Sequence, residues 1–247
     1  MNHLVVANWK MHMTGTQASA FLDDFLARVL PDDVDVAIAP PFTAIARVGD
    51  RLRGGAIALA AQDVFWEQSG AYTGEISAEM LKDVGCAYVL IGHSERRQYF
   101  GETDETVNRK ARAALANGLT PIVCVGESGA ERDAGEALAR VVAQTRASLD
   151  GLGRDGVARV VMAYEPLWAI GTGKNCDADD ADATMCAMRA SVDGLRDARI
   201  LYGGSMKAEN VAAYARKPNI DGGLVGGASL DPAGFAALIL AARQGMR

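Results

Sequence analysis

Eight short apolar runs, separated by longer amphipathic segments, are the feature that most constrains how this chain can fold. The runs cover residues 4–7, 34–39, 57–61, 87–91, 120–125, 160–164, 199–202 and 223–225. Most of them are apolar without interruption, as is typical of parallel strands that are buried on both faces. The segments between them have the periodicity of helices; in residues 16–30, for example, one face carries Phe21, Leu22, Phe25, Leu26 and Val29.

Eight strand–helix units in a chain of 247 residues fit a closed (β/α)8 barrel. The alternative is an open, doubly wound sheet, which usually has a G-x-G-x-x-G turn after its first strand. Here the first run leads into Asn8-Trp9-Lys10, so we prefer the barrel, although periodicity alone does not separate the two folds. No linker or low-complexity run divides the chain, which predicts one barrel domain over residues 1–247.

The net charge and the cysteine content indicate which partners and which cellular compartment to expect. The net charge is −6, with acidic and basic residues mixed along the chain, which argues against nucleic acid or an anionic membrane as the main partner. An anionic substrate would therefore need a local source of attraction. The N-terminus has no signal-peptide pattern, no apolar run has transmembrane length, and the four cysteines show no CxxC spacing. We expect a reduced, cytoplasmic protein.

Cofactor motifs are missing from the sequence. No set of His, Cys, Asp and Glu has convincing metal spacing, and neither a Walker nor a Gly-x-Ser-x-Gly pattern occurs. Cys124 lies inside an apolar run, where a core residue is expected in preference to a nucleophile. The sequence therefore predicts chemistry with neither a metal nor an organic cofactor.

Unusual polar residues and glycines follow most of the apolar runs. In a barrel, catalytic groups gather at the carboxyl ends of the strands, so these residues would meet at one rim. In chain order they are Asn8, Lys10, Gln62, Asp63, His93, Ser94, Glu95, Glu127, Glu165, Gly203, Gly204, Ser205, Gly226 and Gly227. The pattern predicts a single active site at this rim.

Glu165 is followed by a loop whose composition is typical of a lid. Residues 166–174 begin with proline, continue with bulky apolar residues and end in Gly-Thr-Gly-Lys. A stiff body with a mobile hinge would have this composition. The alternative is an ordinary strand–helix connection that carries a core-facing tryptophan.

Glycines in three of the rim loops indicate a phosphate site. Their backbone N–H groups could hold an anion, and a short helix beginning at Gly227 would aim its N-terminus at it. These glycines are Gly171, Gly203, Gly204, Gly226 and Gly227. Ser205 adds a hydroxyl donor at the same rim. The alternative is that these glycines only permit tight turns. Three such loops converging on one rim favour the phosphate site.

His93 and Lys10 are the remaining candidates. His93 precedes Ser94-Glu95, where the start of a helical turn would disfavour the cationic imidazole and leave a neutral donor for a carbonyl oxygen. Lys10 would supply a local positive charge. The alternatives are a structural histidine and a lysine whose ammonium reaches solvent from a strand end.

The chain resembles the triosephosphate isomerase family over essentially its whole length. The motifs that carry the resemblance are Asn8-Trp9-Lys10-Met11, Tyr72-Thr73-Gly74-Glu75, residues 91–97, residues 124–127, residues 163–173, residues 202–205 and residues 223–230. The motifs around His93 and Glu165 are very specific, whereas the glycine clusters alone are not.

The resemblance implies interconversion of dihydroxyacetone phosphate and D-glyceraldehyde 3-phosphate, a step of glycolysis and gluconeogenesis, through an enediolate. It implies that Glu165 removes the proton and that a neutral His93 polarises the carbonyl and shuttles protons. It further implies that Asn8 and Lys10 stabilise the enediolate and that Glu95 helps to hold the site. The phosphate would be bound by backbone N–H groups of Gly171, Ser205, Gly226 and Gly227.

The resemblance also suggests a homodimer in which a loop over residues 62–75, with Thr73 near its tip, reaches the neighbouring active site. Two positions depart from the family pattern. Met13 stands where small or amide residues are more usual, and Asp63 stands where many relatives have asparagine. Asp63 would need a charge partner if it is buried.

Two other functions remain open at this point. A phosphate-binding barrel without activity would have lost Glu165, His93 or Lys10, and none is lost. A barrel enzyme for another sugar phosphate would differ in the motifs around His93 and Glu165. We therefore expect an isomerase.

Overall fold

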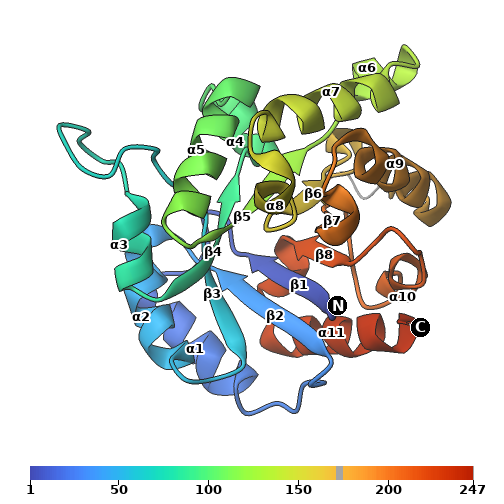
Figure 1. The fold of residues 1–247 in the computed structure, drawn as a ribbon. Helices are drawn as coiled ribbons and strands as arrows, with labels where there is room; N and C mark the ends of the chain where they lie inside the picture. Colours follow the sequence, from blue (N-terminus) through green and yellow to red (C-terminus); the bar gives the residue numbers. More distant parts are fainter. Residues whose placement is uncertain (171–174, 247) are drawn as a thin grey trace.

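A closed barrel of eight parallel strands forms the centre of the molecule (Figure 1). The structure is a computed structural model that describes residues 1–170 and 175–246. The strands are β1 (His3–Asn8), β2 (Val34–Ala39), β3 (Ile57–Ala61), β4 (Cys86–Ile91), β5 (Thr120–Val125), β6 (Val161–Tyr164), β7 (Arg199–Tyr202) and β8 (Gly222–Val225). Each pairs with its neighbour in chain order, and β1 pairs with β8.

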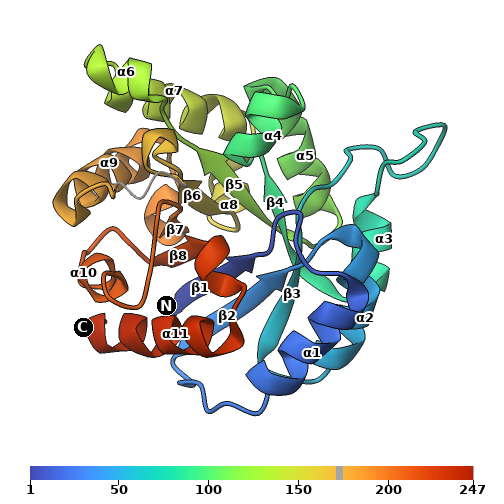
Figure 2. The same cartoon turned by 180° about the vertical axis from the view of Figure 1, so that it is seen from behind.

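Helices surround the barrel on its outside in both views (Figures 1 and 2). The α-helices are α1 (Gly15–Phe25), α2 (Phe42–Leu52), α3 (Ala78–Asp83), α4 (Ser94–Tyr99), α5 (Asp104–Ala116), α6 (Gly129–Asp133), α7 (Ala137–Leu149), α8 (Gly153–Val157), α9 (Ala178–Ser191), α10 (Val211–Ala215) and α11 (Pro232–Gly245). Short 3-10 helices are η1 (Leu167–Ala169), η2 (Leu195–Asp197) and η3 (Gly227–Ser229). This arrangement confirms the predicted (β/α)8 barrel.

The eight predicted strands match the observed ones to within one residue at each end. The open sheet is excluded because β1 lies in register with β8, from Leu4 opposite Gly222 to Ala7 opposite Val225. Helix α11 begins as its sequence suggests, since the Asp231 carboxylate accepts a hydrogen bond from the Gly234 N–H at 2.6 Å and Pro232 occupies the first turn.

Two apolar layers explain why the strands are apolar on both faces. One layer fills the barrel interior with alternate strand residues, among them Leu4, Val6, Ile122 and Leu201. The other layer lies between the strands and the helices and contains the residues in between. Each strand is buried on both sides, so the apolar runs need no polar alternation.

Parallel strands in a closed barrel place all eight carboxyl ends at one rim, and the helices return the chain to the other end. The segment between β3 and α3 projects from the barrel in both ribbon views (Figures 1 and 2). The polar residues identified in the sequence therefore share the carboxyl rim.

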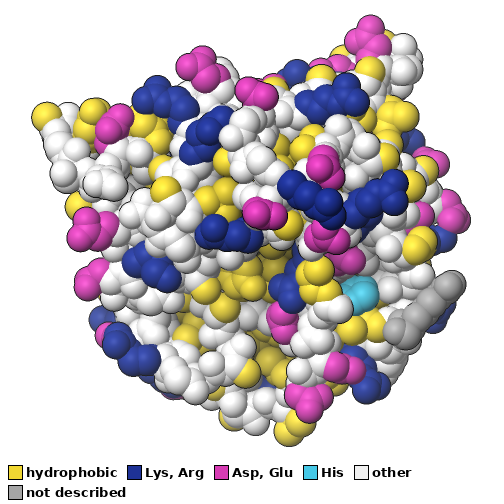
Figure 3. Space-filling view, in the orientation of Figure 1, with side chains coloured by type: hydrophobic (Ala, Val, Ile, Leu, Met, Phe, Trp, Pro, Cys, Tyr) yellow, Lys and Arg dark blue, Asp and Glu magenta, His cyan; other side chains and the backbone are white. Residues whose placement is uncertain are grey.

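The surface carries mixed charges on the face shown in Figure 3, where basic and acidic side chains alternate without a large area of one sign. Within residues 1–170 and 175–246, no helix is both long enough and apolar enough to span a membrane.

Gly126, directly after β5, provides a test of this packing. A Cβ at this position would lie 1.7 Å from the Glu165 carbonyl oxygen, so Gly126→Ala must push β5 and β6 apart. We expect a loss of about 3 kcal/mol in the free energy of unfolding, measured by urea denaturation.

Gly129 is the matched control for this substitution, because a Cβ there would meet only the Trp168 Cβ at 3.6 Å. Gly129→Ala is expected to keep the free energy of unfolding within about 1 kcal/mol of the original. Equal effects of the two substitutions would contradict the packing argument.

Candidate active site

A cavity of about 400 Å³ opens at the carboxyl rim of the barrel. The residues predicted from the sequence that line it are Asn8, Lys10, His93, Glu165, Gly203, Gly204, Ser205, Gly226 and Gly227. Its wall also contains Ile170, Asn175, Met206, Lys207, Leu224 and Ala228. Gly171 and the end of the predicted lid, residues 171–174, lie outside the described residues. The fold thus brings together residues from strands far apart in the sequence.

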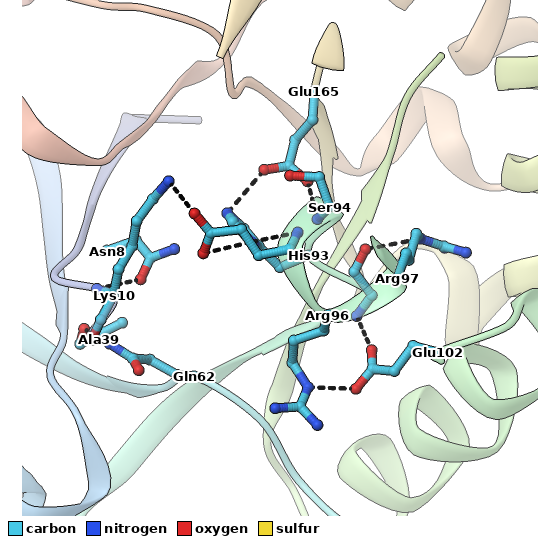
Figure 4. A network of polar contacts seen from close by, with 12 residues as sticks. Asn8, Lys10, Ala39, Gln62, His93, Ser94, Arg96, Arg97, Glu102 and Glu165 are labelled. Atoms are coloured by element: carbon cyan, nitrogen blue, oxygen red, sulfur yellow. Dashed lines mark hydrogen bonds and ion pairs between the residues drawn. The ribbon is translucent and has the colours of Figure 1, made fainter. Parts of the chain in front are cut away.

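Glu165 directly follows β6 and is almost completely buried, with 2% of its surface exposed. One carboxylate oxygen, Oε1, lies 3.0 Å from His93 Nε2. The other, Oε2, accepts a hydrogen bond from the Ser94 backbone N–H at 2.8 Å (Figure 4). A buried carboxylate held in this way has a fixed orientation at the cavity wall.

His93 is the N-cap residue of α4, as the sequence suggested. Its Nδ1 accepts a hydrogen bond from the Glu95 backbone N–H at 3.3 Å, while Nε2 faces Glu165. An accepting Nδ1 and a donating Nε2 correspond to a neutral imidazole with its proton on Nε2. The helix start therefore sets the tautomer and points Nε2–H toward the cavity.

Opposing influences act on the pKa values of this pair. Burial alone would raise the pKa of the Glu165 carboxyl, but attraction to His93, the hydrogen bonds from His93 and Ser94, and Lys10 together lower it. Burial alone would lower the pKa of His93, but the carboxylates of Glu165 and Glu95 raise it. Glu165 is thus stabilised as the anion that a base requires.

Lys10 lies two residues past the end of β1, across the cavity from Glu165. Its Nζ lies 2.7 Å from Glu95 Oε1. Its backbone has a φ of 49°, which is uncommon for a residue other than glycine. Asn8 Oδ1 accepts from the Lys10 N–H at 3.0 Å, and Gln62 Nε2 donates to the Lys10 carbonyl at 2.9 Å (Figure 4). These bonds hold the left-handed turn that directs the ammonium inward.

The glycine loops after β7 and β8 form another side of the cavity. Helix η3 begins at Gly227, where the sequence predicted a short helix. Gly204 must be glycine, because a Cβ there would lie 2.1 Å from the Tyr202 hydroxyl. Ser205 Oγ donates to the Ala169 carbonyl at 2.7 Å, so the loop after β7 is bonded to η1.

A buried charge cluster behind the site was not predicted from the sequence. Lys110 Nζ lies 2.6 Å from Asp63 Oδ1 and also contacts Glu102, which in turn accepts from the Gly92 N–H at 3.0 Å. Arg96 contacts both carboxylates. Asp63 is buried and has the charge partners that it needs. Because Glu102 holds Gly92, the cluster fixes the turn that carries His93.

The sequence placed Glu127 at the rim but assigned it no function, and the structure shows which groups it binds. It is fully buried after β5 and accepts hydrogen bonds from Tyr164 Oη at 3.1 Å and from Trp168 Nε1 at 2.7 Å. Its carbonyl accepts from the Leu167 N–H at 3.0 Å. Glu127 therefore fastens η1 next to Glu165.

In the part of the chain that the structure describes, no group of three or more His, Cys, Asp or Glu side chains is arranged to hold a metal ion. Cys124 is buried inside the barrel and packs in its interior layer.

Comparison with known proteins agrees with this geometry. Residues 3–242 match the family model described as Triosephosphate isomerase. A relative from Symbiobacterium thermophilum named triosephosphate isomerase is 53% identical over 98% of this chain and 97% of the relative. The chain belongs to the triosephosphate isomerase family.

Two further relatives with the same name agree with this membership. A triosephosphate isomerase from Herpetosiphon aurantiacus is 51% identical over 96% of this chain and 97% of its own length. One from a Thermoanaerobacter species is 49% identical over 96% of this chain and 98% of its own length. The resemblance to the triosephosphate isomerase family drawn from the sequence motifs is thereby confirmed.

The pKa of His93 depends on Glu165 in this geometry. In Glu165→Gln, the negative charge and the acceptor at Oε1 are lost, so the pKa of His93 falls, because only Glu95 still raises it. Titration of the imidazole resonances by NMR measures this fall, with His3 and His12 as internal controls. An unchanged pKa of His93 would show that the pair is not coupled.

The same two pKa shifts make the free energy of unfolding depend on pH. Since the pKa of His93 is raised on folding, its contribution to stability is full below the pKa of the unfolded chain and is lost as the pH rises through the folded pKa. The lowered pKa of Glu165 contributes above its unfolded pKa, and this contribution is lost as the pH falls through the folded pKa.

Proposed function

We propose that this chain interconverts dihydroxyacetone phosphate and D-glyceraldehyde 3-phosphate, as expected for glycolysis and gluconeogenesis, with Glu165 as the catalytic base. The observation that carries the proposal is the contact between the buried Glu165 carboxylate and His93 Nε2 at the wall of a cavity that Lys10 also lines. Base, hydrogen-bond donor and cation meet there on rigid strand ends.

The first step follows from the position of Glu165. A substrate that enters the cavity would take the place of the Glu165–His93 bond, with its acidic carbon toward the carboxylate and its carbonyl oxygen toward His93 Nε2. Glu165 removes the proton, and the C–H electron pair forms the carbon–carbon double bond of the enediolate. The protonated Glu165 then returns the proton to the neighbouring carbon, which completes the isomerisation.

The charge that develops on oxygen needs stabilisation. His93 Nε2–H donates to the carbonyl oxygen and exchanges protons between the two substrate oxygens. The Lys10 ammonium, held by Glu95, supplies positive charge beside the enediolate, and Asn8 adds a polar side chain at the end of β1. These roles of a glutamate base and a hydrogen-bonding histidine are those known for the triosephosphate isomerase family.

The phosphate is proposed to bind opposite the base. Gly226, Gly227 and Ser205 line the cavity, and η3 begins at Gly227. Gly171 belongs to the same proposal but lies outside the described residues. Binding energy from the phosphate, which does not react, can be used to hold the reacting carbon against Glu165.

We also propose that residues 166–174 form a lid. The part that the structure describes supports this, since Ile170 lines the cavity and the Ala169 carbonyl accepts from Ser205 Oγ in the proposed phosphate site. Exclusion of water over the enediolate would limit loss of the phosphate as a by-product.

A homodimer and a cytoplasmic location complete the proposal. The segment between β3 and α3, which contains residues 62–75, projects from the barrel (Figure 2). Tyr72, next to Thr73 in this segment, is exposed. We propose that this arm reaches a second copy of the chain. Met13, in the loop after β1, has a φ of 73°, a backbone conformation that glycine or asparagine adopts more readily. All four cysteines are free, which fits a reducing compartment.

A coupled isomerase assay of the purified protein tests the proposal. Glu165→Gln keeps the size of the side chain but removes the base, so kcat is expected to fall at least about a hundredfold. The control is Glu79→Gln, an exposed carboxylate in the first turn of α3, which should keep kcat within about twofold. Equal activity of the original protein and Glu165→Gln would reject Glu165 as the base.

A further inference from the structure

Lys207 is a cation of the cavity wall that has no part in the mechanism above. It lies in the loop between β7 and α10, two residues after Ser205, and lines the same cavity as Gly226 and Gly227. Its side chain is exposed to solvent. It therefore stands where the cavity meets the surrounding water, on the side of the proposed phosphate site.

The backbone around Lys207 is held in place on both sides. Met206 is buried with 4% of its surface exposed, and the Lys207 N–H donates to Asn210 Oδ1 at 2.8 Å. Asn210 Nδ2 reaches back to the Ser205 carbonyl at 3.3 Å, and the Val211 N–H donates to the Lys207 carbonyl at 3.0 Å. This closed turn fixes the start of the Lys207 side chain at the rim beside Ser205.

The charged side chains at the cavity differ in whether a neighbouring group of opposite charge compensates them. Lys10 lies 2.7 Å from the Glu95 carboxylate, and Glu165 adds a negative charge. Within the described residues, the Lys207 ammonium has neither an ion pair nor a hydrogen bond, so its charge is not compensated by a neighbouring carboxylate. In a chain of net charge −6, this is a local source of attraction for an anion.

We propose that Lys207 attracts the substrate's phosphate dianion to the site and strengthens its binding there. The inference rests on the proposed function, because it assigns Lys207 to the phosphate side of the same cavity. An exposed charge at a rim acts mainly on the encounter with the ligand and on its affinity. Loss of the Lys207 charge should therefore lower kcat/KM and leave kcat nearly unchanged, since Glu165, His93 and Lys10 perform the reaction.

Lys207→Gln removes the charge and keeps a polar side chain of similar length. The expected result is a roughly fivefold lower kcat/KM at an ionic strength of about 10 mM, with kcat within about twofold. At about 0.5 M salt the difference between the two proteins should nearly disappear, because exposed charges are screened. Lys207→Arg should restore most of kcat/KM.

Lys82→Gln is the matched control, because it makes the same change in net charge. Lys82 is exposed in α3 and its ammonium donates to the Gly118 carbonyl, which precedes β5 at the other end of the barrel. This variant should keep kcat/KM near the original at every salt concentration. Equal losses in Lys207→Gln and Lys82→Gln, or a loss in Lys207→Gln that salt does not reduce, would overturn the proposal.

Binding of glycerol 3-phosphate, measured by calorimetry, separates this inference from the proposed function. If the original protein lacks isomerase activity, the proposed function fails, but a salt-sensitive rise in Kd for Lys207→Gln alone would still support the role of Lys207. If the original protein is active and Lys207→Gln has unchanged Kd and kcat/KM, only the inference about Lys207 fails.

Discussion

The pairing of β1 with β8 is the constraint on which the site depends, because it joins the first strand of the chain to the last. Leu4 lies opposite Gly222, which has a φ of 141° and where a Cβ would lie 1.9 Å from the Leu4 carbonyl oxygen. At the other end of this pair, a Cβ on Gly226 would lie 3.2 Å from Lys10 Cε. Glycine at both positions permits the close approach that brings Lys10 beside the loop after β8.

Closure of the barrel also brings charged side chains of opposite sign into contact at the carboxyl rim, where they compensate one another. His93 follows β4 and Glu165 follows β6, with β5 between them, and their side chains meet over the rim. Each shifts the pKa of the other toward the charged form against the effect of burial. Lys10 is compensated by Glu95. Behind them, Lys110 and Arg96 balance Asp63 and Glu102. Rigid strands and buried ion pairs hold the reacting groups in place.

Much of this architecture could be predicted from the sequence. Each strand is a local run whose burial on both faces demands apolar residues, so its position is visible without any partner. The residues at the rim could be predicted because they come shortly after the apolar runs, as Glu165 does after β6. The place of His93 before α4 was predicted to disfavour the cation, and the structure shows the Glu95 N–H donating to Nδ1. The carboxylate of Glu165, which the sequence did not place beside His93, and that of Glu95 act in the other direction and raise its pKa.

Interactions between distant segments could not be predicted in the same way. Nothing in the sequence near Asp63 identifies Lys110 as its partner, since they meet only when α5 packs beside the barrel. Glu102 precedes α5 and Lys110 lies within it, and nothing in the neighbouring sequence indicates that their side chains meet. Lys207 carries no motif, and its role depends on which cavity its loop lines. The predicted Gly171 and the end of the lid lie outside the described residues.

The central claim is that the rim built by this closure moves a proton through Glu165. Isomerisation of dihydroxyacetone phosphate in D2O, followed by NMR of the product, tests it most directly. A proton that leaves carbon for a carboxylate can exchange with solvent, so the account predicts deuterium at C2 of the glyceraldehyde 3-phosphate. A product that forms at the full rate and carries only protium at C2, both with the original protein and with Glu165→Gln, would contradict proton transfer through Glu165.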